Sequence, residues 1–251
     1  MSRSILSARG LSKSFRGFTA VDGVDLDIRE GAIHALIGPN GAGKTTVFNL
    51  LTKFLAPTAG RLVYEDRDIT NLSPVQIARM GLVRSFQISS VFPKLSVLQN
   101  VRVALQRQAG LAHQFWLPES GLSILNARGL ELLQEVGLLD RANALAGELS
   151  YGRKRALELA TTLALQPKIL LLDEPMAGMG HEDIASVARL IRSVSAGRTV
   201  LMVEHNLDVV ADLCDRITVL QRGKVLAEGT YQEVSSNPEV RRAYIGEDDD
   251  E

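Results

Sequence analysis

The fold of this chain is decided by the stretch Gly38-Pro39-Asn40-Gly41-Ala42-Gly43-Lys44-Thr45-Thr46. It fits the phosphate-binding loop pattern, which is a glycine, four variable residues, Gly-Lys and then Ser or Thr. Its glycines let the backbone turn tightly, so that N–H groups can approach phosphate oxygens. Lys44 adds a positive charge for the outer phosphates, and Thr45 offers a hydroxyl ligand to Mg²⁺. The stretch therefore predicts a site for a nucleoside triphosphate.

The residues on either side of the loop support this interpretation. Residues 32–37 are mostly apolar and predict a buried strand that runs into the loop, and residues 47–51 continue a helix behind it. The positive N-terminal end of that helix would face the phosphates. A chance glycine-rich turn would lack this order of strand, loop and helix. We therefore expect an α/β fold with a P-loop NTPase core.

Composition narrows the class of protein. The chain has 251 residues, of which 45% are apolar and 23% charged, as in a soluble globular protein. Its net charge of −1 gives no basic field for nucleic acid, and residues 247–251 form an acidic tail. Cys214 has no second cysteine to pair with. No apolar run approaches the ~18–20 residues of a membrane span, so we expect a cytosolic-type protein that reaches a membrane only through a partner.

The pattern of apolar residues divides the chain. Residues 24–28 alternate as in an antiparallel strand, whereas residues 169–172 form an unbroken apolar run, as in a central parallel strand. Between about 88 and 164 the strand signals give way to helical spacing. We predict three parts: a nucleotide-binding α/β core with a small antiparallel β subdomain (1–87 and 165–230), a helical insertion (88–164), and a C-terminal helix with the acidic tail (231–251).

Two carboxylates follow the apolar run 169–172. In open α/β sheets the ligand crevice lies at this carboxyl end of the strands. Asp173 is placed to hold Mg²⁺, and Glu174 is placed to orient or deprotonate an attacking water. The alternative is that the pair caps a helix.

Three further polar residues are candidates at the same site. His205 follows the strand predicted at 199–203, which favours a γ-phosphate contact over a purely structural histidine. Gln87 ends another strand, and its amide can ligate Mg²⁺ or bond the attacking water. Ser150 opens a helix, where it is either an N-cap or a free hydroxyl at an anion site.

Taken together, these motifs resemble the ATP-binding cassette ATPases over nearly the full length of the chain. The stretch GPNGAGKTT resembles Walker A, Gln87 the Q-loop, LSYG at 149–152 the signature, ILLLDEP Walker B, and His205 the switch histidine. The resemblance implies ATP and Mg²⁺ as cofactors, with Thr45, Gln87 and Asp173 on the metal. It also implies that Phe15 stacks on adenine; the alternative is a core aromatic.

The resemblance also implies partners. Two cassettes of this family pair head to tail, so that Ser150 and Gly152 of one chain contact the ATP bound at Lys44 of the other. The second cassette is a copy of this chain or a paralogue. Two transmembrane permease subunits would hold the pair at the cytoplasmic face of the inner membrane, with a substrate-binding protein as an indirect partner and no nucleic acid.

Departures from the common pattern point to a subgroup. Tyr151 and Arg153 replace Gly and Gln of the signature LSGGQ, and Gly180 stands where the D-loop aspartate is common. With the stretches VEHNLDVV, GKVLAEGT and NPEVRRAYIG, they resemble the cassettes of branched-chain amino acid uptake systems. We expect the ATPase subunit of an importer for branched-chain or other hydrophobic amino acids or related small amides. The alternatives are a lipopolysaccharide-type exporter ATPase, a soluble non-transport cassette ATPase, and a small-molecule kinase.

Overall fold

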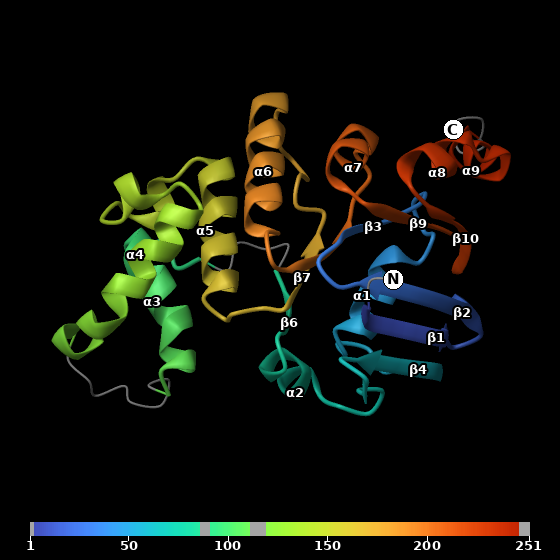
Figure 1. The fold of residues 1–251 in the computed structure, drawn as a ribbon, viewed down its shortest axis with the longest axis horizontal. Helices are drawn as coiled ribbons and strands as arrows, with labels where there is room; N and C mark the ends of the chain where they lie inside the picture. The colour runs from blue at the N-terminus through green and yellow to red at the C-terminus, as the bar shows by residue number, and fades with distance from the viewer. Residues whose placement is uncertain (1–2, 86–90, 111–118, 246–251) are drawn as a thin grey trace.

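The computed structural model describes residues 3–85, 91–110 and 119–245. Two sheets run through this part of the chain, a larger one that is mostly parallel and a smaller antiparallel one. Helices cover the larger sheet and form a separate group at one end of the molecule (Figure 1). The structure confirms the predicted α/β class, with a mostly parallel sheet, an antiparallel β part and a helical insertion.

The larger sheet has the strand order β10-β9-β3-β8-β7-β6, and every neighbouring pair is parallel except β10 with β9. Every residue of β3, β7 and β8 is buried, which explains why their sequences are mostly apolar. The strands are β3 (Ile33–Ile37), β6 (Leu82–Arg84), β7 (Ile169–Asp173), β8 (Thr199–Val203), β9 (Arg216–Gln221) and β10 (Lys224–Gly229).

The antiparallel sheet has the order β2-β1-β4-β5, with β1 (Ser4–Phe15), β2 (Phe18–Arg29), β4 (Ala59–Tyr64) and β5 (Arg67–Asp68). The mostly apolar residues at 5–8 predict only a short strand, whereas β1 spans 12 residues. Its register against β2 shifts between Ala8 and Leu11 and again before Ser14. These irregularities interrupt the alternation of apolar and polar residues, so the sequence pattern ends where the strand continues.

The helices largely follow the predicted positions. They are α1 (Lys44–Leu51), α2 (Pro74–Arg79), α3 (Val97–Gln108), α4 (Asn126–Glu135), α5 (Tyr151–Leu163), α6 (His181–Val194), α7 (Leu207–Leu213), α8 (Tyr231–Ser236) and α9 (Pro238–Ile245). Short 3₁₀ turns occupy η1 (Glu119–Leu125), η2 (Leu139–Arg141) and η3 (Ala146–Glu148).

Capping explains two of the short helices. The sequence Ser73-Pro74-Val75-Gln76 predicts a capping box at the start of α2, and the structure confirms it. The sequence predicts a single C-terminal helix that starts at Asn237 and Pro238, and the structure adds α8 before it, which begins with a capping box formed by Thr230 and Glu233. This capping box is therefore a usable signal for α8, which has too few turns to show a clear apolar period.

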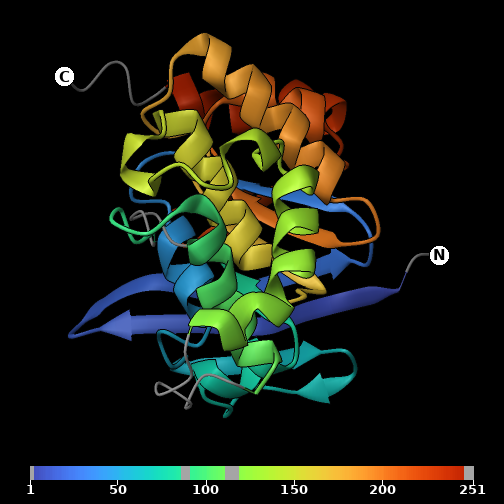
Figure 2. The ribbon, with the colours of Figure 1, turned by 90° about the vertical axis from the view of Figure 1, so that its left-hand side faces the viewer.

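Two apolar clusters cover the two faces of the larger sheet. In β8, Val200 and Met202 join one cluster, whereas Leu201 and Val203 join the other, because successive strand residues face opposite sides. In Figure 1, α6 and α7 stand above the larger sheet, and α1 and the antiparallel sheet lie below it. Figure 2 shows these layers from the end that carries α3 and α4. The phosphate-loop strand β3 therefore lies in the middle of the core.

One polar side chain is fully buried in β3. The Nε2 atom of His34 lies 2.8 Å from Oγ1 of Thr218, which comes from the neighbouring strand β9. Burial, with smaller contributions from the charges of Arg216 and Arg29, lowers the pKa of His34 from 6.5 to about 3. The imidazole therefore stays neutral in the folded protein at neutral pH.

This buried histidine predicts a pH-dependent stability. Below pH 6.5 the unfolded chain takes up a proton at His34 and the native chain does not. The free energy of unfolding therefore has its full value above pH 6.5 and decreases as the pH falls toward about 3. Between pH 7 and pH 5 the parent should lose about 2 kcal/mol more unfolding free energy than His34→Gln, which cannot titrate. Urea unfolding at both pH values measures this difference. Equal losses in the two proteins would show that His34 is protonated in the native state.

Candidate active site

Strands β3, β8, β7 and β6 are parallel neighbours, so their carboxyl ends meet at one edge of the larger sheet. The register places Leu36 opposite Val203 and Val203 opposite Asp173, which puts the ends of β3, β8 and β7 at one level. The structure thus brings the phosphate loop, Asp173, Glu174 and His205 to a common edge. Gln87 lies outside the described residues.

The phosphate loop is packed where only glycine fits. Gly38 and Gly43 have φ values of 146° and 98°. A Cβ atom at Gly38 would lie 2.1 Å from the carbonyl oxygen of Leu220, and one at Gly43 would lie 2.6 Å from that of Ala20. The loop is therefore held between β9 and β2. Its two pattern glycines are required by these backbone contacts as well as by the turn itself.

Helix α1 starts at the end of this loop. Its N-cap, Gly43, supplies no side-chain cap, and its first turn holds no acidic residue, so its N-terminal N–H groups can bind an anion. Lys44 Nζ donates to the carbonyl oxygens of Gly38 at 2.5 Å and of Pro39 at 2.8 Å. This folds the ammonium group back over the loop. The Thr45 side chain is exposed in the same first turn.

Asp173 is buried at the end of β7 and forms an ion pair with Arg84 of β6 through Oδ2. Its other oxygen, Oδ1, is also buried and accepts no hydrogen bond from the residues that the structure describes. A carboxylate oxygen with spare acceptor capacity is a donor that Mg²⁺ prefers. Asp173 and the exposed hydroxyl of Thr45 therefore fit a magnesium site that also takes ligands from phosphate and water.

The described residues contain no cluster of three or more His, Cys, Asp or Glu that could hold a metal ion by itself. The alternative of Asp173 and Glu174 as helix caps is not what the structure shows, because α6 begins at His181 with Gly180 as its N-cap.

Arg84 is a site residue that the sequence analysis missed. Besides its ion pair with Asp173, it donates from Nη1 to Oδ1 of Asn49 in α1 at 2.6 Å. Its guanidinium carbon lies 5.2 Å from the ring centroid of Phe48 and 5.7 Å from that of Phe54. Arg84 thus joins β6, β7 and α1. An arginine directly after the apolar residues Leu82 and Val83, in the strand that leads to Gln87, was the available signal.

Glu174 has an unusual backbone conformation. Its φ of 45° is in the left-handed region, which costs a non-glycine residue on the order of 1 kcal/mol. Its N–H donates to the carbonyl oxygen of Val203 at 3.0 Å, which helps to hold this conformation. The half-buried carboxylate makes no hydrogen bond or ion pair with other described residues. It is therefore available to a water molecule at this edge.

His205 follows β8 with an exposed side chain, which argues against a buried structural histidine. Its backbone N–H, and that of Asn206, donate to Oε2 of Glu204 at 3.0 and 3.2 Å. Glu204 is fully buried and was also missed by the sequence analysis. Its signal was a charged residue directly after an apolar strand.

Ser150 occupies the N-cap position of α5, as predicted, but its exposed hydroxyl does not cap the helix. The hydroxyl is therefore available to another ligand. At Gly152 a Cβ atom would lie 2.9 Å from Oδ1 of Asp183 in α6. Figure 1 shows α5 beyond β7 at the helical end, well apart from α1. A single chain thus does not bring Ser150 to Lys44.

Phe15 ends β1 and is 42% exposed, so the alternative of a core aromatic is wrong. It pairs with Phe18 across the turn, and Lys13 Nζ lies 5.2 Å from its ring centroid. An exposed ring of this kind can stack on a flat heterocycle.

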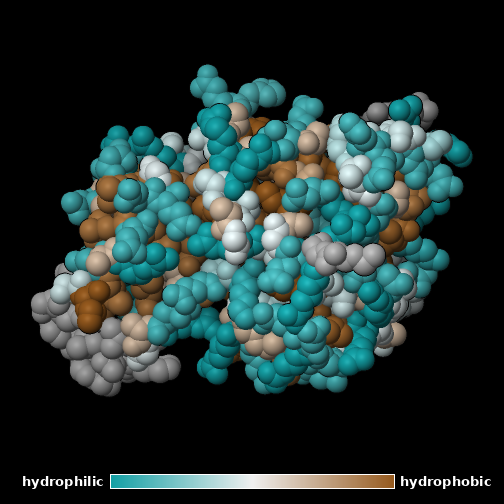
Figure 3. Space-filling model, in the orientation of Figure 1, coloured by the Kyte–Doolittle hydropathy of each residue, from teal (hydrophilic) through white to brown (hydrophobic). Residues whose placement is uncertain are grey.

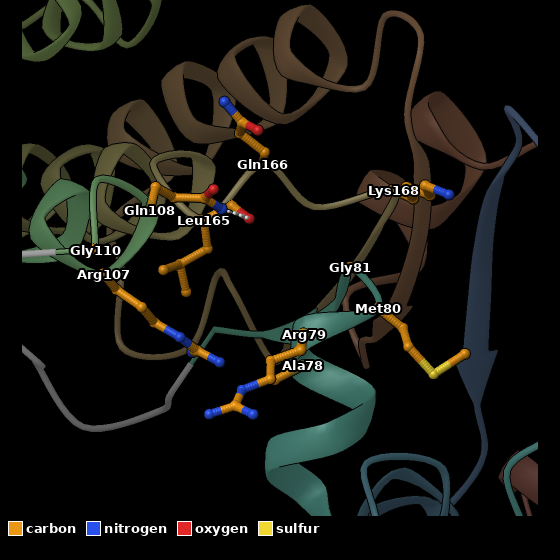
Figure 4. Close-up of a pocket in the computed structure, with 10 residues that line it drawn as sticks. All are labelled: Ala78, Arg79, Met80, Gly81, Arg107, Gln108, Gly110, Leu165, Gln166 and Lys168. Atoms are coloured by element: carbon orange, nitrogen blue, oxygen red, sulfur yellow. Dashed lines mark hydrogen bonds between the residues drawn. The ribbon is translucent and has the colours of Figure 1, made fainter. Parts of the chain in front are cut away.

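A separate cavity of about 450 Å³ lies at the opposite edge of the sheet, where Gly81 and Lys168 precede β6 and β7. Figure 4 shows the side chains of Arg79 and Arg107 reaching toward the same space from α2 and α3. Lys168 instead pairs with Glu65 at 2.6 Å. None of the predicted site residues lines this cavity, so size alone does not mark the site.

Comparison with known proteins shows which family the chain is similar to. A profile described as ABC transporter matches residues 21–177, and one described as branched-chain amino acid ATP-binding cassette transporter matches residues 224–250. The chain is 41% identical to the high-affinity branched-chain amino acid transport ATP-binding protein LivG of Salmonella typhimurium, over 98% of this chain and 100% of that protein. It is 40% identical, with the same coverage, to the corresponding protein BraF of Pseudomonas aeruginosa.

Solved structures agree with these relatives. The chain matches the ADP conformation of an ATP-binding cassette of an ABC transporter with a TM-score of 0.85 and 31% identity, covering 98% of this chain and 100% of that one. A nucleotide-free cassette from an ABC transporter matches with a TM-score of 0.85 and 30% identity, covering 97% and 100%.

Proposed function

Because this chain belongs to the ABC transporter family of ATP-binding cassettes, we propose that it is the ATP-binding and ATP-hydrolysing subunit of an importer for branched-chain or other hydrophobic amino acids or related small amides. The observation that carries the proposal is the common edge where the phosphate loop, Asp173, Glu174 and His205 meet. The relatives named for branched-chain amino acid transport support the substrate class over a lipopolysaccharide-type exporter or a soluble cassette.

ATP binding rests on the loop of residues 38–46 and on the N-terminus of α1. Backbone N–H groups from Asn40 to Thr46 would surround the phosphates. Lys44 would exchange its bonds to the carbonyl oxygens of Gly38 and Pro39 for phosphate oxygens, which are stronger partners because they are charged. Phe15 would stack on adenine through its exposed face.

Thr45, Asp173 and Gln87 would hold Mg²⁺. The ion would neutralise charge on the phosphates. Arg84 contributes by fixing the orientation of the Asp173 carboxylate, since their ion pair leaves Oδ1 as the oxygen without a protein partner among the described residues.

Hydrolysis then needs a water molecule and a base. Glu174 would orient the water and take its proton while the water oxygen attacks the γ-phosphorus and the bond to the β–γ bridging oxygen breaks. His205 would contact the γ-phosphate from the end of β8, and Gln87 would contact the water or the metal. The held backbone of Glu174 and the loop bearing His205 supply the positioning on which phosphoryl transfer mainly depends.

A second cassette would complete the site. Ser150 and Gly152 lie at the N-terminus of α5, where a free hydroxyl and a bare helix end suit an anion. They lie apart from the phosphate loop of their own chain (Figure 1). We infer that they contact the ATP of a partner cassette, either a copy of this chain or a paralogue.

No helix in the described part of the chain is long and apolar enough to cross a membrane. The relatives named as transport ATP-binding proteins support membrane partners. We infer two permease subunits, an indirect role for a substrate-binding protein, no nucleic acid, and a place on the cytoplasmic face of the inner membrane.

The candidate docking surface is a cavity of about 270 Å³ between β6 and the helical insertion, lined by Phe92 and Val103 among others. Figure 3 shows apolar surface over the end of the molecule that carries α3 and α4.

Phe92 itself favours docking. From the sequence, Val91 and Phe92 could either contact a membrane subunit or pack the helical insertion onto the core. The Phe92 side chain is 52% exposed, which argues against packing for this residue, whereas Val91 does pack against the core. Asn100 accepts the Phe92 N–H at 2.7 Å and donates to the Phe92 carbonyl oxygen at 3.1 Å, which fixes the position of this residue. A held and exposed aromatic ring suits a short helix of a membrane subunit.

The first test of this function concerns the base. Glu174→Gln keeps the shape of the side chain and removes its basicity, so ATP hydrolysis should fall by about 10²–10⁴-fold while ATP still binds. Lys44→Ala should instead weaken ATP binding itself, because it removes a direct phosphate contact. Steady-state hydrolysis and equilibrium ATP binding separate the two effects. If Glu174→Gln hydrolyses ATP at the rate of the parent protein, Glu174 is not the catalytic base.

The second test concerns the docking surface. Phe92→Asp should weaken co-purification with the permease subunits and leave the melting temperature and ATP binding nearly unchanged, because the ring is exposed. Ile124→Asp is a matched control, since Ile124 is more exposed and does not line this cavity. Normal assembly and transport by Phe92→Asp would move the docking surface elsewhere on the insertion.

A further inference from the structure

The loop of residues 175–180 connects Glu174 to α6 and lacks the aspartate that is common there in the family. Within the loop, the Ala177 N–H donates to the carbonyl oxygen of Glu174 at 3.0 Å, and the Met179 N–H donates to that of Met176 at 3.3 Å. The loop therefore holds the backbone of Glu174 in position through a direct hydrogen bond. Two side chains from other elements hold it from outside.

The first is Glu204, at the end of β8. Its Oε1 accepts the Met176 N–H at 3.1 Å, while its Oε2 accepts the N–H groups of His205 and Asn206. A fully buried carboxylate is tolerated only when such donors satisfy it. One side chain thus joins the loop after Glu174 to the loop that carries His205.

The second is Tyr151, at the start of α5. Its hydroxyl donates to the carbonyl oxygen of Ala177 at 3.1 Å. Arg155 fixes this hydroxyl by donating to it from Nη2 at 3.1 Å and lies with its guanidinium carbon 5.4 Å from the tyrosine ring centroid. Arg155 is itself held by a buried ion pair with Glu158 at 2.9 Å. The tyrosine hydroxyl therefore has a defined direction, toward the loop.

We propose that Glu204 and Tyr151 are positioning residues for ATP hydrolysis, which clamp the loop of residues 175–180 at two adjacent residues. Glu204 holds the N–H of Met176 and Tyr151 holds the carbonyl of Ala177, so the loop is fixed on both sides next to Glu174. This inference rests on the proposed function of Glu174 as the base.

The clamp connects two departures from the family pattern. A glycine at position 151, as in the common signature, would have no hydroxyl to reach Ala177. In this chain the signature helix α5 therefore holds the loop through Tyr151, and the loop carries Gly180 in place of aspartate. A non-glycine residue at positive φ persists only where surrounding contacts over-determine it, and Glu174 meets this condition through its held neighbours.

The test uses the full chain and the variants Tyr151→Phe, Glu204→Gln and their combination. Each single change should lower kcat for ATP hydrolysis by about tenfold, since a shift of about 1 Å can cost up to about 10²-fold. KM, the equilibrium affinity for ATP and the melting temperature of Tyr151→Phe should stay at parental values, because this tyrosine is 44% exposed and only its hydroxyl is removed. The double variant should lose less than the product of the single losses, because both changes release one loop.

Matched controls lie away from the clamp. Tyr64→Phe removes a hydroxyl that bonds a carbonyl oxygen of Met80, and Glu228→Gln removes a carboxylate that pairs with Arg216. Both should keep parental kcat. Glu174→Gln is measured in the same experiment, and loss of hydrolysis in that variant supports the proposed function. If Tyr151→Phe and Glu204→Gln then keep the parental kcat, the clamp is wrong and the proposed function still stands. If Glu204→Gln does not fold, the kcat of Tyr151→Phe alone tests the clamp. A lower kcat of Tyr151→Phe that comes with a lower melting temperature would also contradict the clamp, because it would indicate a general loss of stability.

Discussion

The parallel alignment of β3, β8 and β7 is the constraint on which the rest of the structure depends. Because Leu36, Val203 and Asp173 share one level of the sheet, the residues that follow each strand leave the core at the same edge. The order of the strands thus converts three distant stretches of sequence into one site. The two apolar clusters hold this order by covering both faces of the sheet.

The charged side chains at that edge of the sheet differ in how far they are buried. Asp173 and Glu204 are both buried. Oδ2 of Asp173 pairs with Arg84, and Glu204 accepts backbone N–H groups from the loops beside it. An unpaired buried carboxylate would cost several kcal/mol, so these contacts fix the loops around them. Glu174 and His205 are left more accessible to substrate and water. The protein therefore fixes these two carboxylates by its own contacts, and leaves Oδ1 of Asp173 for a metal ion and Glu174 and His205 for substrate and water.

Much of this organisation could be predicted from the sequence, because the motifs are short and local. The phosphate loop, the buried strand before Asp173 and the helix start at Ser150 depend on neighbouring residues only. The bonds of Arg84 to Asp173 and of Tyr151 to Ala177 could not be predicted, since they join residues far apart in the chain. The position of Gln87 remains a prediction.

The central claim is that this edge is half of an ATP site, which Ser150 of a second cassette completes. Sedimentation of Glu174→Gln with and without MgATP tests it most directly, because this variant should hold ATP without consuming it. We predict a dimer that forms only with ATP and is lost when Ser150→Arg, which places bulk and charge at the start of α5, is added. A dimer of the Ser150→Arg double variant, or no ATP-dependent dimer of Glu174→Gln even with the membrane partners present, would contradict the account.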